Sequence, residues 1–156
     1  IYSVRFMESK GYVVTFRQVD PLFSLDLSVP TNPRVTGELK IPGFSEFMVP
    51  MDQNHLLTIG RDATPQGRVQ GLALQIFDVT NPARPTQSHK FSYSASEYGH
   101  SEALYDPKAF TYFKERGLLA FQLHQGAPME IRLRNVRLRD PVVSLPSTLR
   151  ARMASR

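Results

Sequence analysis

Short alternating runs of apolar and polar residues, without helical periodicity, dominate the first 125 positions of the sequence. The runs are rich in β-branched and aromatic residues, and the first four expected strands are residues 2–6, 12–16, 22–25 and 38–41. Clusters of glycine, proline and asparagine separate them. Short strands at this spacing, with such turns between them, predict an antiparallel all-β fold.

One phrase of residues occurs twice along the chain. Residues 26–33 (DLSVPTNP) match residues 78–85 (DVTNPARP) in the pattern D-[LV]-[ST]-x-P-x-x-P, at an offset of 52. Upstream, residues 12–16 match residues 55–59 at an offset of 43, which makes His55 the counterpart of Tyr12. The difference of nine predicts an insertion, and the polar segment 61–71 fits as a loop. Residues 117–121 resemble a third copy of the strand that begins at Gly11.

The size of this repeat predicts the architecture. Units of about 45–55 residues with four short strands are typical of β-propeller blades. A single four-stranded sheet cannot bury both of its faces, so successive sheets stack and share apolar side chains. We predict a partial β-propeller of about three four-stranded antiparallel blades in residues 1–125. The blades are expected at about 1–43, 44–98 and 99–125, the last one incomplete.

The number of blades predicts that the chain is a fragment. A closed propeller needs about 4–8 blades, and the sequence starts at Ile1, within an expected strand. We therefore expect the missing blades of the same polypeptide to be partners of this chain. We also expect the isolated chain to be marginally stable and to associate through its free blade faces.

Residues 126–156 differ from everything before them. Residues 1–125 hold 12 basic and 12 acidic side chains, whereas the tail holds seven arginines against Glu130 and Asp140, which accounts for the whole net charge of +5. The tail has no lysine and no aromatic residue. We predict a disordered Arg-rich tail, interpreted as a truncated or out-of-frame end, in which residues 131–139 could form an edge strand. Its charge favours salt-dependent contact with anions over specific nucleic-acid binding, because aromatic residues for base stacking are absent.

Composition excludes several kinds of site. The chain has no cysteine, which excludes a disulfide framework, a thiolate zinc site and a cysteine nucleophile. No apolar run approaches the length of about 20 residues that a membrane helix needs. The four histidines, at positions 55, 89, 100 and 124, show no metal-ligand spacing, so neither a metal nor a cofactor is expected.

The most site-like stretch is His100-Ser101-Glu102, followed by Asp106. A hydrolase hypothesis would make Ser101 the nucleophile and His100 its base, but adjacent residues of a strand point to opposite faces. The pair Ser45-Glu46 repeats the Ser101-Glu102 pair at the start of the preceding blade. Repetition favours a structural role, in which the serine caps a turn and the glutamate accepts from backbone amides.

Several of these segments resemble a known family. Residues 1–6 (IYSVRF), 11–28 (GYVVTFRQVDPLFSLDLS), 37–45 (GELKIPGFS), 76–82 (IFDVTNP), 101–110 (SEALYDPKAF) and 117–121 (GLLAF) are similar to the secreted β-propeller-domain family of bacteria and archaea. The resemblance covers about residues 1–123. It implies a larger exported or cell-surface protein without an established enzymatic activity. The sequence departs from the family in two places, Met48-Val49-Pro50 and Asp106-Pro107-Lys108, where relatives often carry a histidine, as Leu-His-Pro and Asp-His-Lys; Val49 and Pro107 stand at the histidine positions.

Two hypotheses for function remain at this point. The first is a non-catalytic interaction or scaffold module of an exported protein, whose blade loops contact a protein or glycan partner. The best candidate loop carries Arg61, Asp62, Gln66 and Arg68. The alternative is part of a hydrolase or lyase whose axial site draws polar groups from several blades. The three visible blades repeat no such group except the Ser-Glu pair, which favours the first hypothesis.

Overall fold

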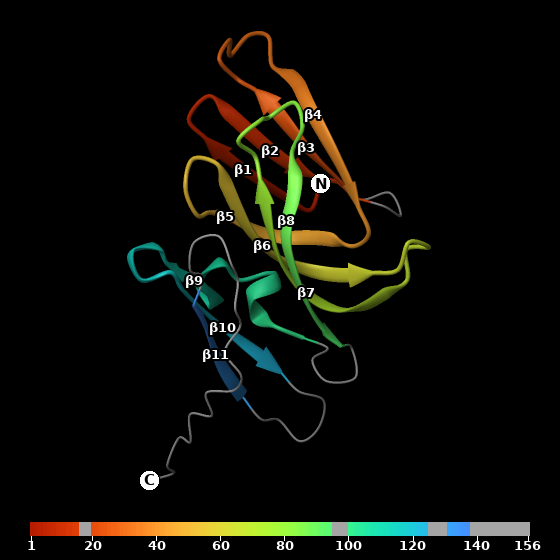
Figure 1. Cartoon of the computed structure of the whole chain (residues 1–156), viewed down its shortest axis with the longest axis vertical. Helices are drawn as coiled ribbons and strands as arrows, with labels where there is room; N and C mark the ends of the chain where they lie inside the picture. Colours follow the sequence, from red (N-terminus) through yellow and green to blue (C-terminus); the bar gives the residue numbers. More distant parts are fainter. Residues whose placement is uncertain (16–19, 95–99, 125–130, 138–156) are drawn as a thin grey trace.

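A computed structural model of the chain describes residues 1–15, 20–94, 100–124 and the backbone of residues 131–137. Three antiparallel sheets follow one another along the chain and fan out from the first sheet to the third (Figure 1). Within the described residues the fold is all-β, apart from three short 3₁₀ turns. The expected partial propeller of about three blades, the last one incomplete, is confirmed.

The first two sheets have four strands each, arranged in sequence order. Sheet 1 consists of β1 (Ser3–Met7), β2 (Lys10–Val14), β3 (Asp20–Asp26) and β4 (Arg34–Ile41). Sheet 2 consists of β5 (Phe44–Pro50), β6 (His55–Ala63), β7 (Val69–Asp78) and β8 (Thr86–Ser94).

Sheet 3 has three strands: β9 (Phe110–Phe113), β10 (Leu118–His124) and β11 (Ile131–Arg137). It is preceded by the 3₁₀ turns η1 (Glu102–Leu104) and η2 (Pro107–Ala109), and η3 (Lys114–Arg116) joins β9 to β10. Strand β11 pairs with β10 along its whole length, so sheet 3 extends past residue 125, where the sequence placed the end of the propeller. The disorder expected for residues 126–156 is wrong for residues 131–137, which form β11, and stays a prediction for residues 126–130 and 138–156, which lie outside the described residues.

The repeated phrase forms the same structure in sheets 1 and 2. Asp26 Oδ1 accepts a hydrogen bond from the Ser28 amide at 2.9 Å, and Asp78 Oδ1 accepts one from the Thr80 amide at the same distance. In both sheets the chain then makes a turn that is closed by a backbone hydrogen bond of 2.9 Å. Because the aspartate caps its own turn and the prolines restrict it, this phrase determines the outer hairpin of each sheet.

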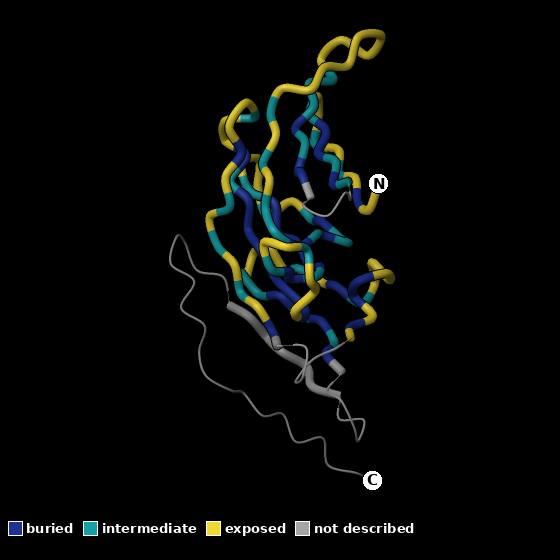
Figure 2. The backbone as a smooth tube through the Cα atoms, turned by 90° about the vertical axis from the view of Figure 1, so that its right-hand side faces the viewer, coloured by how far each residue is buried: buried dark blue, intermediate teal, exposed yellow. Residues whose placement is uncertain are grey.

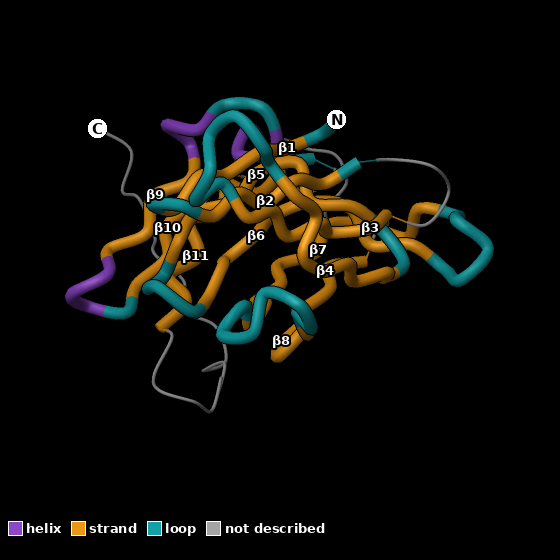
Figure 3. Tube along the Cα trace, turned by 90° about the horizontal axis from the view of Figure 1, so that it is seen from above, coloured by secondary structure: helices purple, strands orange, loops and turns teal. Residues whose placement is uncertain are grey.

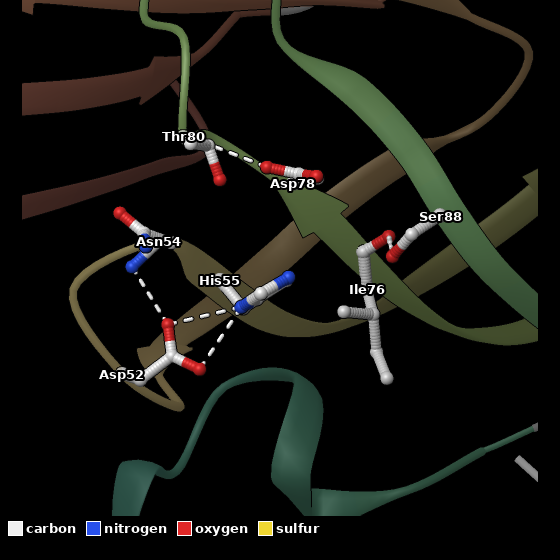
Figure 4. Close-up of polar contacts among 7 residues, drawn as sticks. All are labelled: Asp52, Asn54, His55, Ile76, Asp78, Thr80 and Ser88. Carbon is white, nitrogen blue, oxygen red and sulfur yellow. Dashed lines mark hydrogen bonds and ion pairs between the residues drawn. The ribbon is translucent and has the colours of Figure 1, made fainter. Parts of the chain in front are cut away.

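The third and fourth strands also correspond at the offset of 52. A β-bulge interrupts the pairing of β3 with β4 between Ser24 and Leu25, and the pairing of β7 with β8 between Ile76 and Phe77. Beside each bulge a hydroxyl group of the fourth strand donates to a carbonyl oxygen of the third. Thr36 donates to Ser24 O at 3.1 Å. Its counterpart Ser88 donates to Ile76 O at 3.0 Å, as Figure 4 shows.

The alignment of the second strands needs a correction. Asp26 pairs with Lys10, and its counterpart Asp78 pairs with His55, so β2 and β6 correspond at an offset of 45 residues (10 to 55) instead of 43. The counterpart of His55 is therefore Lys10, and that of Tyr12 is Leu57. Strand side chains alternate with a period of two, so a shift of two residues keeps every side chain on its face and leaves a similar sequence pattern.

Two apolar clusters fill the spaces between the sheets, and Figure 2 shows buried segments concentrated in the interior. The first cluster joins sheet 1 to sheet 2 through Tyr12, Val14, Leu22, Met48, Leu56, Phe77 and Val79. The second joins sheet 2 to η1 and sheet 3 through Leu57, Ile59, Leu72, Leu74, Ile76, Tyr93, Ala103, Leu104, Phe110, Leu119, Phe121 and Leu123. Sheet 2 is thus buried on both faces, which explains the nearly continuous apolar runs of β6 and β7.

The two clusters use equivalent faces. We call the face of a sheet that meets the following sheet its leading face, and the face that meets the preceding sheet its trailing face. Val14 and Leu22 form a cross-strand pair on the leading face of sheet 1, and their counterparts Ile59 and Leu74 form one on the leading face of sheet 2. Each interface therefore joins a leading face to a trailing face, as in a propeller.

Candidate functional site

The two Ser-Glu pairs occupy different local structures. Ser45 lies inside β5, where its buried hydroxyl donates to Thr58 Oγ1 at 3.0 Å. Glu46 is the extra residue at a β-bulge in β5, and its carboxylate lies 3.7 Å from Arg61 Nε. Burial raises the pKa of Glu46, and the charge of Arg61 offsets part of that rise.

Ser101 caps a 3₁₀ turn instead of lying in a strand. Its hydroxyl oxygen accepts from the Ala103 amide at 3.2 Å, and its hydroxyl group donates to the backbone carbonyl oxygen of Gln122 in β10. Ser101 is fully buried, whereas Glu102, in the first turn of η1, is exposed. What Ser45 and Ser101 share is a buried hydroxyl that bonds to the second strand of its sheet.

The His100 side chain contacts Tyr105 and not Ser101. Its exposed ring lies with Nε2 2.7 Å from the hydroxyl group of Tyr105, and the two rings are 5.4 Å apart. Asp106 caps η2 by accepting from the Lys108 amide at 2.9 Å. The structure therefore brings His100 to Tyr105 and not to Ser101, and the serine hydroxyl is already hydrogen-bonded to backbone atoms.

The candidate loop is shorter than the sequence indicated. Strand β6 continues to Ala63 and β7 begins at Val69, so Arg61 and Asp62 lie within β6 and only Gln66 and Arg68 lie in the connecting loop. The correction has a physical reason. Arg61 lies near Glu46 of the neighbouring strand β5, and Asp62 pairs with Lys90 of β8, two strands away, so their polarity does not require a loop.

Asp62 forms a largely buried ion pair across sheet 2. Its carboxylate lies 2.5 Å from Lys90 Nζ in β8, and its side chain is only 11% exposed. Burial alone would raise the pKa of Asp62, but hydrogen bonds from Lys90 and Ser92, together with the charge of Lys90, lower it overall. Gly71 is the cross-strand partner of Asp62 on β7. The glycine places no side chain in the space between Asp62 and β8.

The loop itself, residues 64–68, is organised by Thr64. The Thr64 hydroxyl oxygen accepts from the amides of Gln66 at 3.3 Å and Arg68 at 3.2 Å. Gly67 has a φ of 80°, a left-handed conformation that favours glycine, and its amide donates to Thr64 O at 2.8 Å. The side chains of Gln66 and Arg68 are exposed on this closed hairpin turn.

Sequence reasoning missed one polar pair at the opposite end of sheet 2. Both carboxylate oxygens of Asp52 lie within 3.0 Å of His55 Nδ1, and Asp52 Oδ1 also accepts from the Asn54 amide at 2.6 Å (Figure 4). Burial would raise the pKa of Asp52, but the bonds from Asn54 and His55 lower it. Asp78 is the cross-strand partner of His55. The D-x-x-H spacing within a turn was the signal that could have revealed the pair.

Metal-binding geometry is absent from the part of the chain that the structure describes, where no three His, Asp or Glu side chains converge. Val49, one of the two departures from the resembled family, is partly buried and packs against the cluster between sheets 2 and 3. Pro107, the other, begins η2, a position where its missing amide donor is not needed. No helix in the described ranges is long and apolar enough to cross a membrane.

Comparisons with known proteins agree with this architecture. An uncharacterised protein of Archaeoglobus fulgidus is 42% identical over 118 residues, which cover 76% of this chain and 18% of that protein. An uncharacterised protein of Methanocaldococcus jannaschii is 45% identical over 82 residues, which cover 53% of this chain and 13% of that protein. No solved structure shows a significant match.

The family profile described as "Beta propeller domain" matches residues 1–140. The match passes residue 123, where the motif resemblance ended, and it includes β11. The structure agrees with this match, because three successive antiparallel sheets pack on one another through equivalent faces, as propeller blades do. The chain belongs to the β-propeller domain family.

Proposed function

We propose that this chain is a non-catalytic section of a propeller scaffold in a larger exported protein, and that the loop of residues 64–68 contacts a protein or glycan partner. One observation carries the non-catalytic part. The Ser101 hydroxyl, the best nucleophile candidate in the sequence, is buried and bonded to backbone atoms, while His100 pairs with Tyr105. A serine nucleophile needs a base within hydrogen-bond reach and an open approach for the substrate.

The organisation of the loop supports its role as a contact surface. Thr64 and Gly67 hold the turn closed through four hydrogen bonds, so Gln66 and Arg68 are presented on an ordered hairpin. A turn that is already ordered loses little conformational entropy when a partner binds. Arginine and glutamine side chains offer several donors, which suit the hydroxyl and carboxylate groups of glycans as well as peptide carbonyls.

Other observations support the proposal that the chain is a section of a larger, exported protein. The matched relatives are several times longer than the matched segments, which supports further blades as partners of the three sheets. The exported location rests on the resemblance of the motifs alone. Nothing in the +5 charge requires a nucleic-acid partner, because the charge comes from the last 31 residues and not from the sheets.

A glycan array probed with the labelled 156-residue chain tests the loop. We expect binding to a subset of acidic or highly hydroxylated glycans. The variant Q66A/R68A is expected to weaken that binding at least about 10-fold, since each lost charge-assisted hydrogen bond contributes about 1.5–3 kcal/mol. The matched control is Arg84→Ala, which removes another exposed arginine from a turn of the same sheet. Equal binding by Q66A/R68A and wild type would contradict the proposed contact.

A fluorophosphonate probe tests the non-catalytic part separately. We expect no labelling of the wild-type chain, because the Ser101 hydroxyl is buried and bonded. Labelling that disappears in the Ser101→Ala variant, with the variant still folded by circular dichroism, would favour the hydrolase alternative instead.

A further inference from the structure

Sheets 1 and 2 bury polar side chains where they face each other. On the leading face of sheet 1, Tyr12 and Ser24 form a cross-strand pair, and both are fully buried. Their counterparts in sheet 2 are Leu57 and Ile76, which are apolar and pack in the cluster between sheets 2 and 3. The first interface is therefore polar at a level of the sheet where the second interface is apolar.

The trailing face of sheet 2 supplies a second polar pair. Thr58 and Gln75 are cross-strand partners, and their exposed fractions are 0% and 1%. Met48, the partner of Thr58 on β5, packs in one cluster with Tyr12. Phe77, which follows Gln75 by two residues and therefore lies on the same face, packs in that cluster too. The two polar pairs thus lie beside the same apolar cluster, between sheets 1 and 2.

Three of these four side chains carry a buried polar atom without a hydrogen-bond partner in the part of the chain that the structure describes. The three atoms are the hydroxyl oxygens of Tyr12 and Ser24 and the amide nitrogen Nε2 of Gln75. The amide oxygen of Gln75 is already paired, since it accepts from Gln87. A buried polar group without a partner costs free energy, so such groups in folded proteins are almost always bonded to protein atoms or to ordered water.

A water molecule meets the requirements of all three atoms. Water both donates and accepts hydrogen bonds, and a buried water molecule typically bonds to about three polar groups that have no other partner. The hydroxyl groups of tyrosine and serine can donate or accept, whereas an amide nitrogen only donates. We propose that the interface between sheets 1 and 2 is a binding site for ordered water, which bridges the hydroxyl groups of Tyr12 and Ser24 to Gln75 Nε2.

The chemistry of these three groups favours water over an ion. An amide nitrogen that only donates does not coordinate a cation. Burial raises the pKa of Tyr12, so its hydroxyl group stays protonated at neutral pH and brings no negative charge to balance a cation. An anion would need a positive partner, and Lys90, the cross-strand neighbour of Gln75, already pairs with Asp62. A small neutral ligand that donates and accepts fits all three atoms.

A high-resolution crystal structure of the 156-residue chain gives the direct test. We expect an ordered solvent peak within about 3.2 Å of the Tyr12 hydroxyl oxygen and of at least one of the other two atoms. The Tyr12→Phe variant removes one partner of the water and should weaken or abolish this peak. The matched control is Tyr93→Phe, which removes a tyrosine hydroxyl group from the cluster between sheets 2 and 3. It should leave the peak unchanged.

Urea denaturation tests the site in solution, because a bridged and a dry interface predict effects of opposite sign. With water bound, Tyr12→Phe loses a hydrogen bond and is expected to raise the equilibrium constant of unfolding about 5-fold. In a dry interface the same variant removes an unpaired buried hydroxyl group and lowers that constant. Ser24→Ala should act in the same direction as Tyr12→Phe. The double variant should lose less than the two single losses combined, because both hydroxyl groups bond to one water.

Three results would overturn the water site. The first is a crystal structure in which the two sheets meet without a solvent peak beside Tyr12, Ser24 or Gln75. The second is a Tyr12→Phe variant that is more stable than wild type, and Ser24→Ala gives the same test should Tyr12→Phe fail to fold. The third is strict additivity of the two single variants, which would show that their hydroxyl groups share no partner.

Discussion

The hydroxyl group of Ser3 in β1 donates a 2.8 Å hydrogen bond to the backbone carbonyl oxygen of Ser45 in β5, joining sheet 1 to sheet 2 between buried residues. Two positions along β1, Arg5 donates to Met48 O through both Nε and Nη2, at 2.9 and 2.6 Å. Apolar burial holds the sheets together but is non-directional. These polar contacts add a preferred alignment of β1 beside β5, and the two strands lie next to each other in the top view of Figure 3.

Removing these bonds should weaken the first interface measurably. Ser3→Ala is expected to lower the free energy of unfolding by about 1 kcal/mol, and Arg5→Ala by about 1.5–3 kcal/mol, because each leaves a carbonyl oxygen of β5 without its donor. Urea denaturation followed by circular dichroism measures both. Arg34→Ala, at an exposed position of β4, should stay within about 0.5 kcal/mol of wild type. Equal effects of Arg5→Ala and Arg34→Ala would show that the bonds to Met48 contribute nothing.

Gly37 gives a second test of the same interface. A Cβ atom at this position of β4 would lie 2.1 Å from the backbone oxygen of Pro82, in the turn that follows β7. Gly37→Ala should therefore cost about 1–3 kcal/mol through overpacking. Gly11→Ala is the matched control, since its Cβ would meet side-chain atoms only, the nearest being the flexible end of Leu27 at 3.2 Å and the next two belonging to Leu25 at 3.4 and 3.5 Å. If the two variants unfolded at the same denaturant concentration, the close approach of β4 to the Pro82 turn would be wrong.

The Lys90–Asp62 pair should matter more than an exposed pair on the surface. Lys90→Gln leaves a buried carboxylate without its charged donor and is expected to cost about 1–3 kcal/mol. The exposed pair of Lys40 and Glu38, 3.3 Å apart, provides the comparison. Lys40→Gln should change the free energy of unfolding by no more than about 0.5 kcal/mol. A larger loss in Lys40→Gln than in Lys90→Gln would contradict the assignment of burial in sheet 2.

Asp62 and Glu46 should respond to pH in opposite directions. The folded-state pKa of Asp62 is lowered, so its stabilising contribution is present above the unfolded value of about 3.9 and disappears as the pH falls through the folded pKa. The advantage of wild type over Asp62→Asn should therefore shrink on acidification. The pKa of Glu46 is raised, so its contribution is present below about pH 4.3 and is lost as the pH rises through the folded pKa. The free energy of unfolding of wild type, relative to that of Glu46→Gln, should therefore decrease over that pH range. Parallel pH profiles of the two variants would contradict these assignments.

Local turn chemistry explains which parts of the fold could be predicted. Asp26 and Asp78 cap their own turns beside prolines, so the contacts that form each turn lie within the eight residues of the repeated phrase. The repeat of the sheets could therefore be predicted from the sequence of this phrase. The second strands lack such a marker. Their alternation with a period of two tolerated an error of two residues, which paired His55 with Tyr12 instead of Lys10.

The candidate site was harder to predict because its contacts connect distant strands. Arg61 and Asp62 look like loop residues in the sequence, and only the positions of Glu46 on β5 and Lys90 on β8 show why they lie within β6. The 3₁₀ turns before β9 gave no periodic signal, since each is only three residues long. Ser45 and Ser101 share a sequence pattern, yet one lies in a strand and the other caps a turn.

A crystal structure of the chain, with sheet 1 superposed on sheet 2, decides most directly whether successive sheets repeat one another. The account predicts that Lys10 falls on His55 and Asp26 on Asp78, with Val14 and Leu22 directed at sheet 2 as Ile59 and Leu74 are directed at sheet 3. Sheets that superpose only in another register, or that meet through two leading faces, would contradict it.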